Sequence, residues 1–175
     1  LWGEISIMAT YIQIGSTVTV GAGGAASIDF SSIPSTYTDL LLVGSVRSSN
    51  SNNYGDVFFT FNGATTNRSA RYLEGSGSAA ASGTQTTMGA GSGQGNSATA
   101  STFGNFQLYI PNYAGSTNKS SSADGVGENN ATQAYATLTA NLWSSTAAIN
   151  RVTIYPDSGN YVQYSSAYIY GVKNA

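Results

Sequence analysis

The sequence predicts an all-β protein: an antiparallel β-sandwich, jelly-roll-like, with 8–10 short strands and essentially no helix. Three observations predict it. Short runs in which apolar and polar residues alternate recur along the 175 residues, and no stripe with helical spacing is sustained. Turn-forming residues separate these runs at intervals of about 10–15 residues. Only 8% of the residues are charged, which excludes exposed helices stabilised by Glu–Lys pairs.

Four runs in the first part of the chain predict strands. Residues 11–20 alternate with one interruption, which predicts a bent strand or a strand pair, and residues 26–30 form a shorter run. Residues 39–47 are apolar at nearly every position, as expected of a strand buried on both faces. In residues 56–62, apolar side chains occupy every second position, so they share one face of the strand.

Four further runs predict strands in the second half, at residues 106–110, 135–143, 149–155 and 164–172. In the second of these, we expect Leu138, Ala140 and Leu142 to point inward and Thr137, Thr139 and Asn141 to point outward. In the last strand, Ser166, Tyr168 and Tyr170 share one face, and Ala167, Ile169 and Gly171 share the other.

Turn chemistry supports this division. Residues 21–24 (Gly-Ala-Gly-Gly) and residues 62–63 (Asn-Gly) are typical of tight turns. Residues 156–160 (Pro-Asp-Ser-Gly-Asn) lie between two alternating runs and predict a hairpin, with Gly159 supplying a positive φ.

The length predicts one domain, residues 11–175, preceded by an extension at residues 1–10. Residues 8–11 (Met-Ala-Thr-Tyr) resemble a start of translation, so the seven residues before Met8 are expected to come from an upstream start, processing or an added segment. Residues 75–101 are almost entirely small and polar, with Met88 as their one bulky apolar residue. They predict either a long loop or an excursion at the edge of the sheet, or else a surface arm that becomes ordered against a neighbouring subunit.

The composition excludes several functions. Without Cys or His there is no thiolate metal site, Ser-His-Asp triad or imidazole acid–base group. Six basic residues scattered along the chain do not form a nucleic-acid footprint. The longest clearly apolar run, residues 40–43, is far shorter than the roughly 20 residues of a membrane helix. We therefore predict no enzyme, no nucleic-acid partner and no membrane insertion.

No catalytic, cofactor-binding or metal residue is assigned. Residues 21–26 match the G-x-G-x-x-A dinucleotide motif, but an alternating strand follows in place of the helix that this motif requires. Asp124 and Glu128 would approach each other only through a turn at the intervening glycines, and the calcium-binding EF-hand spacing is absent.

The aromatic residues leave two interpretations open. We expect six of them to belong either to the core or a subunit interface, or to a platform on which glycan rings stack. They are Tyr135, Trp143, Tyr161, Tyr164, Tyr168 and Tyr170.

Two parts of the chain carry a resemblance to a known class of proteins. Residues 27–34 (SIDFSSIP), which lead into residues 37–43 (YTDLLLV), are one part; residues 149–155 (INRVTIY) with residues 168–173 (YIYGVK) are the other. With these segments the chain resembles small virion structural proteins of tailed bacteriophages, particularly marine and cyanobacterial phages. The resemblance brings no catalytic signature.

The resemblance implies an oligomeric β-sandwich, with a homotrimer expected, that decorates or cements the capsid or forms a head fibre. It implies a place on the virion surface, in contact with copies of itself and with other virion proteins such as the major capsid protein. The alternative is a tail-fibre or receptor-binding module that recognises host-surface polysaccharide. With 14 charged residues and no His, little is expected to titrate between pH 5 and 8, so assembly through apolar and hydroxyl-rich contacts is expected to depend little on pH or salt.

Overall fold

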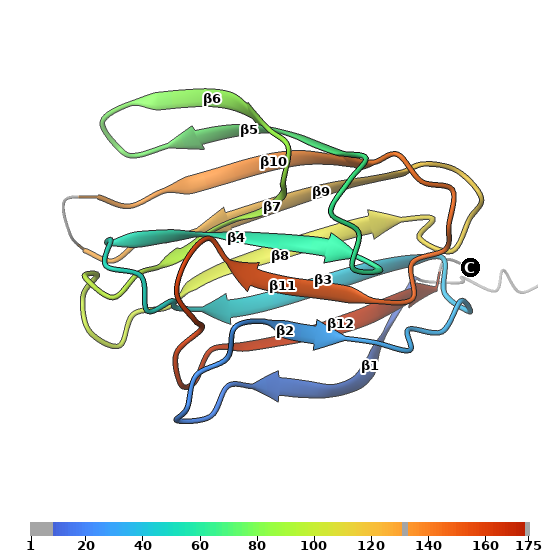
Figure 1. The fold of residues 1–175 in the computed structure, drawn as a ribbon, viewed down its shortest axis with the longest axis horizontal. Helices are drawn as coiled ribbons and strands as arrows, with labels where there is room; N and C mark the ends of the chain where they lie inside the picture. The colour runs from blue at the N-terminus through green and yellow to red at the C-terminus, as the bar shows by residue number, and fades with distance from the viewer. Residues whose placement is uncertain (1–8, 131–132, 174–175) are drawn as a thin grey trace, which may run out of the picture.

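The computed structural model describes residues 9–130 and 133–173 of the chain. In these residues 12 strands form two antiparallel sheets, of eight and four strands, and there is no helix. The predicted all-β sandwich is therefore confirmed, with more strands than the eight to ten expected. In Figure 1 the four-stranded sheet lies in front of the eight-stranded sheet.

The four-stranded sheet contains, in spatial order, β2 (Ile28–Phe30), β11 (Val152–Pro156), β4 (Tyr54–Phe61) and β7 (Met88–Gln94). The eight-stranded sheet contains β1 (Thr10–Thr19), β12 (Ser166–Lys173), β3 (Asp39–Val46), β8 (Gly104–Pro111), β9 (Lys119–Val126), β10 (Ala136–Trp143), β5 (Arg68–Gly75) and β6 (Ala80–Gln85). Residues 1–8, most of the expected extension, lie outside the described residues, and Thr10 already belongs to β1.

The strand order is that of a jelly roll with additions. When the meander β8–β9–β10 is counted as one strand, the strands from β2 to β11 are eight in number. The small sheet then has the order 1-8-3-6 and the large sheet contains the order 2-7-4-5, which is the pairing of a double Greek key. The two additional strands, β1 and β12, extend the large sheet beyond β3. The large sheet is therefore much wider than its partner.

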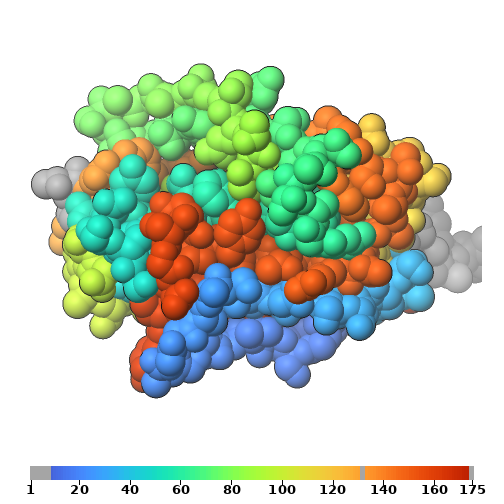
Figure 2. Space-filling model, in the orientation of Figure 1, coloured from blue at the N-terminus to red at the C-terminus, as the bar shows by residue number. Residues whose placement is uncertain are grey.

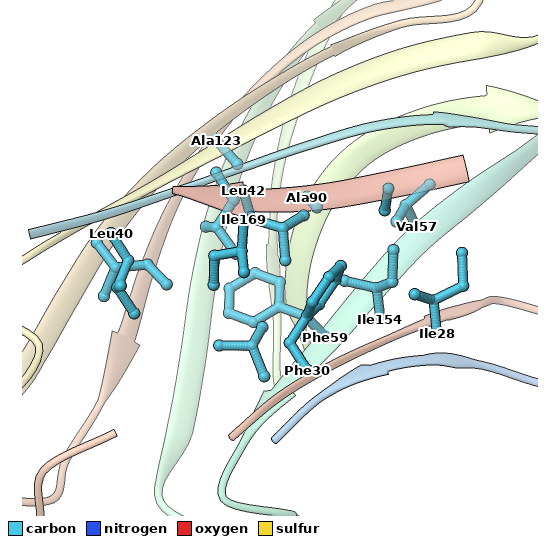
Figure 3. Close-up of a cluster of buried hydrophobic side chains, with 14 of the residues drawn as sticks. Ile28, Phe30, Leu40, Leu42, Val57, Phe59, Ala90, Ala123, Ile154 and Ile169 are labelled. Atoms are coloured by element: carbon cyan, nitrogen blue, oxygen red, sulfur yellow. The ribbon is translucent and has the colours of Figure 1, made fainter. Parts of the chain in front are cut away.

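Alternating side chains from both sheets fill the space between them (Figure 3). Phe59 and Ile154 come from the small sheet, Leu42 and Ile169 come from the large sheet, and all four are fully buried. Phe59 and Phe61 lie on the same face of β4, as the alternation predicts, with ring centroids 5.1 Å apart. Each such side chain contributes about 1.5–3 kcal/mol by leaving water.

The turns are where the sequence predicts them, but they connect different strands from those expected. Gly159 has a φ of 70°, and Asn62 and Gly63 have φ values of 51° and 71°. The prediction of a hairpin at residues 156–160 is wrong, because β11 belongs to the small sheet and β12 to the large sheet. The turn at residues 21–24 likewise leads from β1 in the large sheet to β2 in the small sheet. Greek-key connections cross between sheets, and turn chemistry does not report which sheet the next strand joins.

The small-residue segment 75–101 is not a long loop, since it contains both β6 and β7. Every residue of β7 is buried. Its glycines lie directly against glycines of the large sheet: a Cβ added at Gly91 would lie 2.7 Å from the Cα of Gly125, and one added at Gly104 would lie 2.7 Å from the Cα of Gly93. The small residues therefore let two backbones meet, which is why the segment lacks the bulky alternation used to predict strands.

The expected orientation of β10 is also wrong. Leu138 is 56% exposed and Leu142 is 37% exposed, whereas Thr139 and Asn141 are buried. The polar face points inward because it meets the backbone of β7 rather than apolar side chains. Asn141 forms hydrogen bonds with the peptide of Gly89, and Thr137 with the hydroxyl of Ser92. The apolar face of β10 consequently lies on the outside of the large sheet.

Candidate functional site: a cleft between the two sheets

The structure disperses the six aromatic residues for which the sequence left a core or subunit interface and a glycan platform open. Trp143 is buried beside Phe61, with ring centroids 6.0 Å apart, and Tyr161 is fully buried. Burial raises the pKa of Tyr161 far above its usual value.

The other four aromatic residues of that set lie near the surface in three places. Tyr168 and Tyr170 are half-buried on the outer face of the large sheet, with ring centroids 5.5 Å apart in an edge arrangement. Tyr164 is 69% exposed in the loop before β12. Tyr135, half-buried, is the member of the set that lines the cleft.

This cleft opens where the wide sheet projects beyond the narrow one. Its volume is about 190 Å³. In Figure 1 the β5–β6 hairpin stands apart from β4, and β7 runs between them; Figure 2 shows the surface of the molecule from the same side. The cleft is lined by Tyr54, Asp56, Val57, Phe58, Tyr72, Glu74, Gln85, Gly89, Gly91, Tyr135, Thr137 and Thr139.

The cleft has two walls of side chains and a floor of backbone. Strand β4 contributes Tyr54, Asp56 and Phe58, which alternate with its core residues. Strands β5, β6 and β10 contribute the facing wall, from the inner face of the large sheet where it extends past β7. Between the walls lie Gly89 and Gly91 of β7, which project no side chain into the space.

Local contacts hold the tyrosine rings in place. A Cβ added at Gly83 would lie 2.6 Å from the hydroxyl oxygen of Tyr72, so the ring of Tyr72 lies flat against β6 because that residue is glycine. At the other end, the rings of Tyr54 and Tyr135 meet edge to face with centroids 4.7 Å apart. The amide of Gln133 donates a 2.9 Å hydrogen bond to the hydroxyl of Tyr135.

Two carboxylates, Asp56 and Glu74, give the cleft a negative charge. Burial, together with the charges of Asp157 and Glu74, raises the pKa of Asp56 from 3.8 to about 6. Burial and the neighbouring Tyr135 and Asp56 raise the pKa of Tyr54. The pKa of Asp56 therefore lies between pH 5 and 8, a range in which the composition predicts little titration.

The carboxylates of the cleft have unused hydrogen-bonding capacity. No residue that the structure describes donates a hydrogen bond to the side chain of Asp56 or Glu74, and no Lys or Arg lines the cleft. Among the residues described, no group of three or more acidic side chains is placed to hold a metal ion. Asp124 and Glu128 bind separate partners, the amide of Gln107 at 2.8 Å and the backbone N–H of Asn130 at 2.7 Å.

One spacing in the sequence corresponds to this site. A tyrosine precedes an acid by two residues in two strands, as Tyr54 and Asp56 in β4 and as Tyr72 and Glu74 in β5. The two-residue spacing places each pair on one face of its strand. The strands belong to different sheets, however, so only the topology shows that the two pairs face each other.

Comparisons with protein-family models, with curated protein sequences and with solved structures find no match for this chain. Within the described ranges, no helix is long and apolar enough to cross a membrane.

Proposed function

We propose that this protein is a non-enzymatic virion structural protein that assembles with copies of itself, as a trimer, to decorate or cement the capsid or to form a head fibre. Its place would be the virion surface, in contact with other virion proteins such as the major capsid protein. The resemblance to phage virion proteins supports the proposal. The two parts of the chain that carry this resemblance lie side by side, since β2 pairs with β11 and β3 pairs with β12.

The observation that carries the proposal is an apolar band on the outer face of the large sheet. Leu138 of β10 lies directly opposite Leu73 of β5, and the two side chains are 56% and 55% exposed. Val126 and Leu142 are exposed on the same face, and Gly75, Ala80 and Ala136 complete a shallow groove beside them. Contiguous apolar patches of this kind mark interaction surfaces in soluble proteins.

The inverted orientation of β10 explains the band. Its polar residues face β7, where they form hydrogen bonds, so its leucines point out of the sandwich. There they contact water unless another protein surface covers them. Burying such side chains contributes about 25 cal/mol for each Å² removed from water. Arg71, Glu74, Asp124 and Glu128 line or border the band, and its leucines carry no charge that would repel an identical copy.

Light scattering after size exclusion, together with native mass spectrometry, tests the assembly. The wild-type chain is expected to be a trimer that persists in about 1 M NaCl, because contacts between apolar side chains are not weakened by screening. Leu138→Lys is expected to give monomers with an unchanged far-UV circular dichroism spectrum. Tyr164→Lys, at an exposed position away from the band, is the control and should leave the trimer intact.

A monomeric wild-type chain, or a trimer that dissociates in salt, would contradict the proposed assembly. Virion location is tested separately by quantitative mass spectrometry of purified particles. Many copies per particle are expected of a decoration protein, and few copies of a receptor-binding tip.

A further inference from the structure

We propose that the cleft between β4 and the β5–β6 hairpin is a binding site for one uncharged saccharide unit. The site is distinct from the apolar band, since the two lie on opposite faces of the large sheet. Of the six aromatic residues for which the sequence left glycan stacking open, Tyr135 lines this cleft. The inference does not depend on self-assembly.

The lining matches the chemistry of a sugar ring. A pyranose presents hydroxyl groups around its rim and apolar C–H groups on its faces. Three phenol rings, those of Tyr54, Tyr72 and Tyr135, supply flat apolar surface with a polar edge. The carboxylates of Asp56 and Glu74 accept hydrogen bonds from hydroxyl groups, and they have no donor among the described residues. The side-chain amide of Gln85 adds a neutral donor and acceptor, and the hydroxyl of Thr137, which already pairs with Ser92, lies beside it in the lining.

The size and floor of the cleft favour one ring rather than a long chain. Its volume, about 190 Å³, is below the roughly 300–1,000 Å³ of pockets that enclose drug-sized ligands. Because Gly89 lines it without a side chain, and an added Cβ there would point toward Gln85 and Thr139, a flat ring can approach the backbone of β7.

The charges of the cleft select among ligand classes. Two carboxylates and no lining Lys or Arg disfavour uronic acids, sialic acids and phosphorylated glycans, which would be repelled. An organic ammonium ion would pair with the carboxylates and stack on the tyrosines. It would leave the side-chain amide of Gln85 without a partner, and this group favours a ligand rich in hydroxyls.

Nuclear magnetic resonance titration of the ¹⁵N-labelled full chain tests the proposal. The probes are neutral gluco-, galacto-, manno- and xylo-oligosaccharides, oligogalacturonate as the anionic arm and choline chloride as the cationic arm. At least one neutral oligosaccharide is expected to shift the amide signals of Gly89 and Gly91, and oligogalacturonate and choline are expected to leave them in place.

Matched variants separate binding in the cleft from binding elsewhere. Glu74→Gln keeps the shape of the side chain and is expected to weaken binding about tenfold, because a charge-assisted acceptor is lost. Tyr72→Ala is expected to abolish binding, whereas Tyr72→Phe retains the ring and part of the affinity. Asp124→Asn, on the opposite face, should bind like the wild type, and so should the assembly variant Leu138→Lys.

Three results would overturn the proposal: no shift with any neutral oligosaccharide, a larger shift with choline or oligogalacturonate, or wild-type affinity in a folded Glu74→Gln variant. Chromatography of the titrated sample detects any cleavage of the oligosaccharide. Cleavage would overturn the assignment of the protein as non-enzymatic. Failure of trimer formation leaves all of these titration results interpretable, because each probe is added to the folded chain.

Discussion

The side-chain amide of Asn141 forms two hydrogen bonds with the backbone of Gly89. The N–H of Gly89 donates to Oδ1 of Asn141 at 2.9 Å, and Nδ2 of Asn141 donates to the carbonyl oxygen of Gly89 at 3.0 Å. Both residues are buried, and they belong to β10 of the large sheet and β7 of the small sheet. The side chain of Asn141 thus forms, at the edge of β7, the two hydrogen bonds that the backbone of a neighbouring strand would form.

Replacing Asn141 is expected to destabilise the fold. Asn141→Ala leaves a buried N–H and a buried carbonyl without partners, which should lower the free energy of unfolding by roughly 2–4 kcal/mol. Asn141→Asp should be at least as damaging, because an ionised carboxylate cannot donate to the Gly89 carbonyl. Urea unfolding measures both variants. Asn105→Ala, exposed on β8, is the control and should stay within about 0.5 kcal/mol of the wild type.

The glycine contact between the sheets predicts a second large effect. A Cβ at Gly125 would lie 2.9 Å from the Cα of Gly91 and from the backbone nitrogen of Ser92, and backbone cannot rotate away as a side chain can. Gly125→Ala should therefore cost roughly 3 kcal/mol or more, or prevent folding. At Gly21 no atom lies within 4 Å of an added Cβ, so Gly21→Ala is the matched control. Equal melting temperatures for the two variants would contradict the close contact.

Arg47 is expected to hold the segment after β7 in place. Its guanidinium group donates to four backbone carbonyls, those of Asn96, Ala98, Thr99 and Thr102, at 2.8–3.1 Å. A lysine carries three donors on one nitrogen and cannot reach the same set. Arg47→Lys should destabilise the protein by roughly 2 kcal/mol and speed proteolytic cleavage within residues 95–103. Arg71→Lys, exposed on β5, provides the comparison; equal cleavage rates in the two variants would show that Arg47 does not organise this segment.

The raised pKa of Asp56 predicts a specific dependence of stability on pH. Because the folded state binds this proton more tightly than the unfolded chain does, the contribution of Asp56 is fully favourable below pH 3.8 and is lost as the pH rises to about 6. Asp56→Asn removes that loss. The variant should be more stable than the wild type at pH 7–8, by roughly 2 kcal/mol, and the difference should disappear near pH 4.

Thermal unfolding of both chains between pH 4 and pH 8 measures this effect. Asp124→Asn, whose carboxylate lies on the outer face, should show no comparable gain at neutral pH. A stability difference for Asp56→Asn that is constant across the range would contradict the raised pKa.

The sequence predicted those parts of the fold in which apolar alternation and burial agree. Val57, Phe59 and Phe61 point into the core as their spacing indicates, and so do Ala167 and Ile169. The assignment failed for β10, where polar residues take the inner positions because they bind backbone rather than side chains. It failed for β7 because glycine packing carries no hydrophobic periodicity.

The cleft could not be predicted for a different reason. Tyr54 with Asp56 and Tyr72 with Glu74 have the spacing that places each pair on one face of a strand. Their approach depends on which sheet each strand joins, and the turn at Asn62 and Gly63 has the same local chemistry whether it leads to a hairpin or crosses between sheets.

Strand β7 has the composition of a flexible linker, yet it is buried along its whole length between β4 and the inner face of the large sheet. Away from Gly89 and Gly91, which line the cleft, its amide protons that pair with β4 can reach solvent only when the two sheets separate, which amounts to unfolding of the sandwich. In deuterated water these glycine and serine amides should exchange with the slowest kinetics of the chain. The residues that ordinarily mark mobility would here report the global stability of the protein.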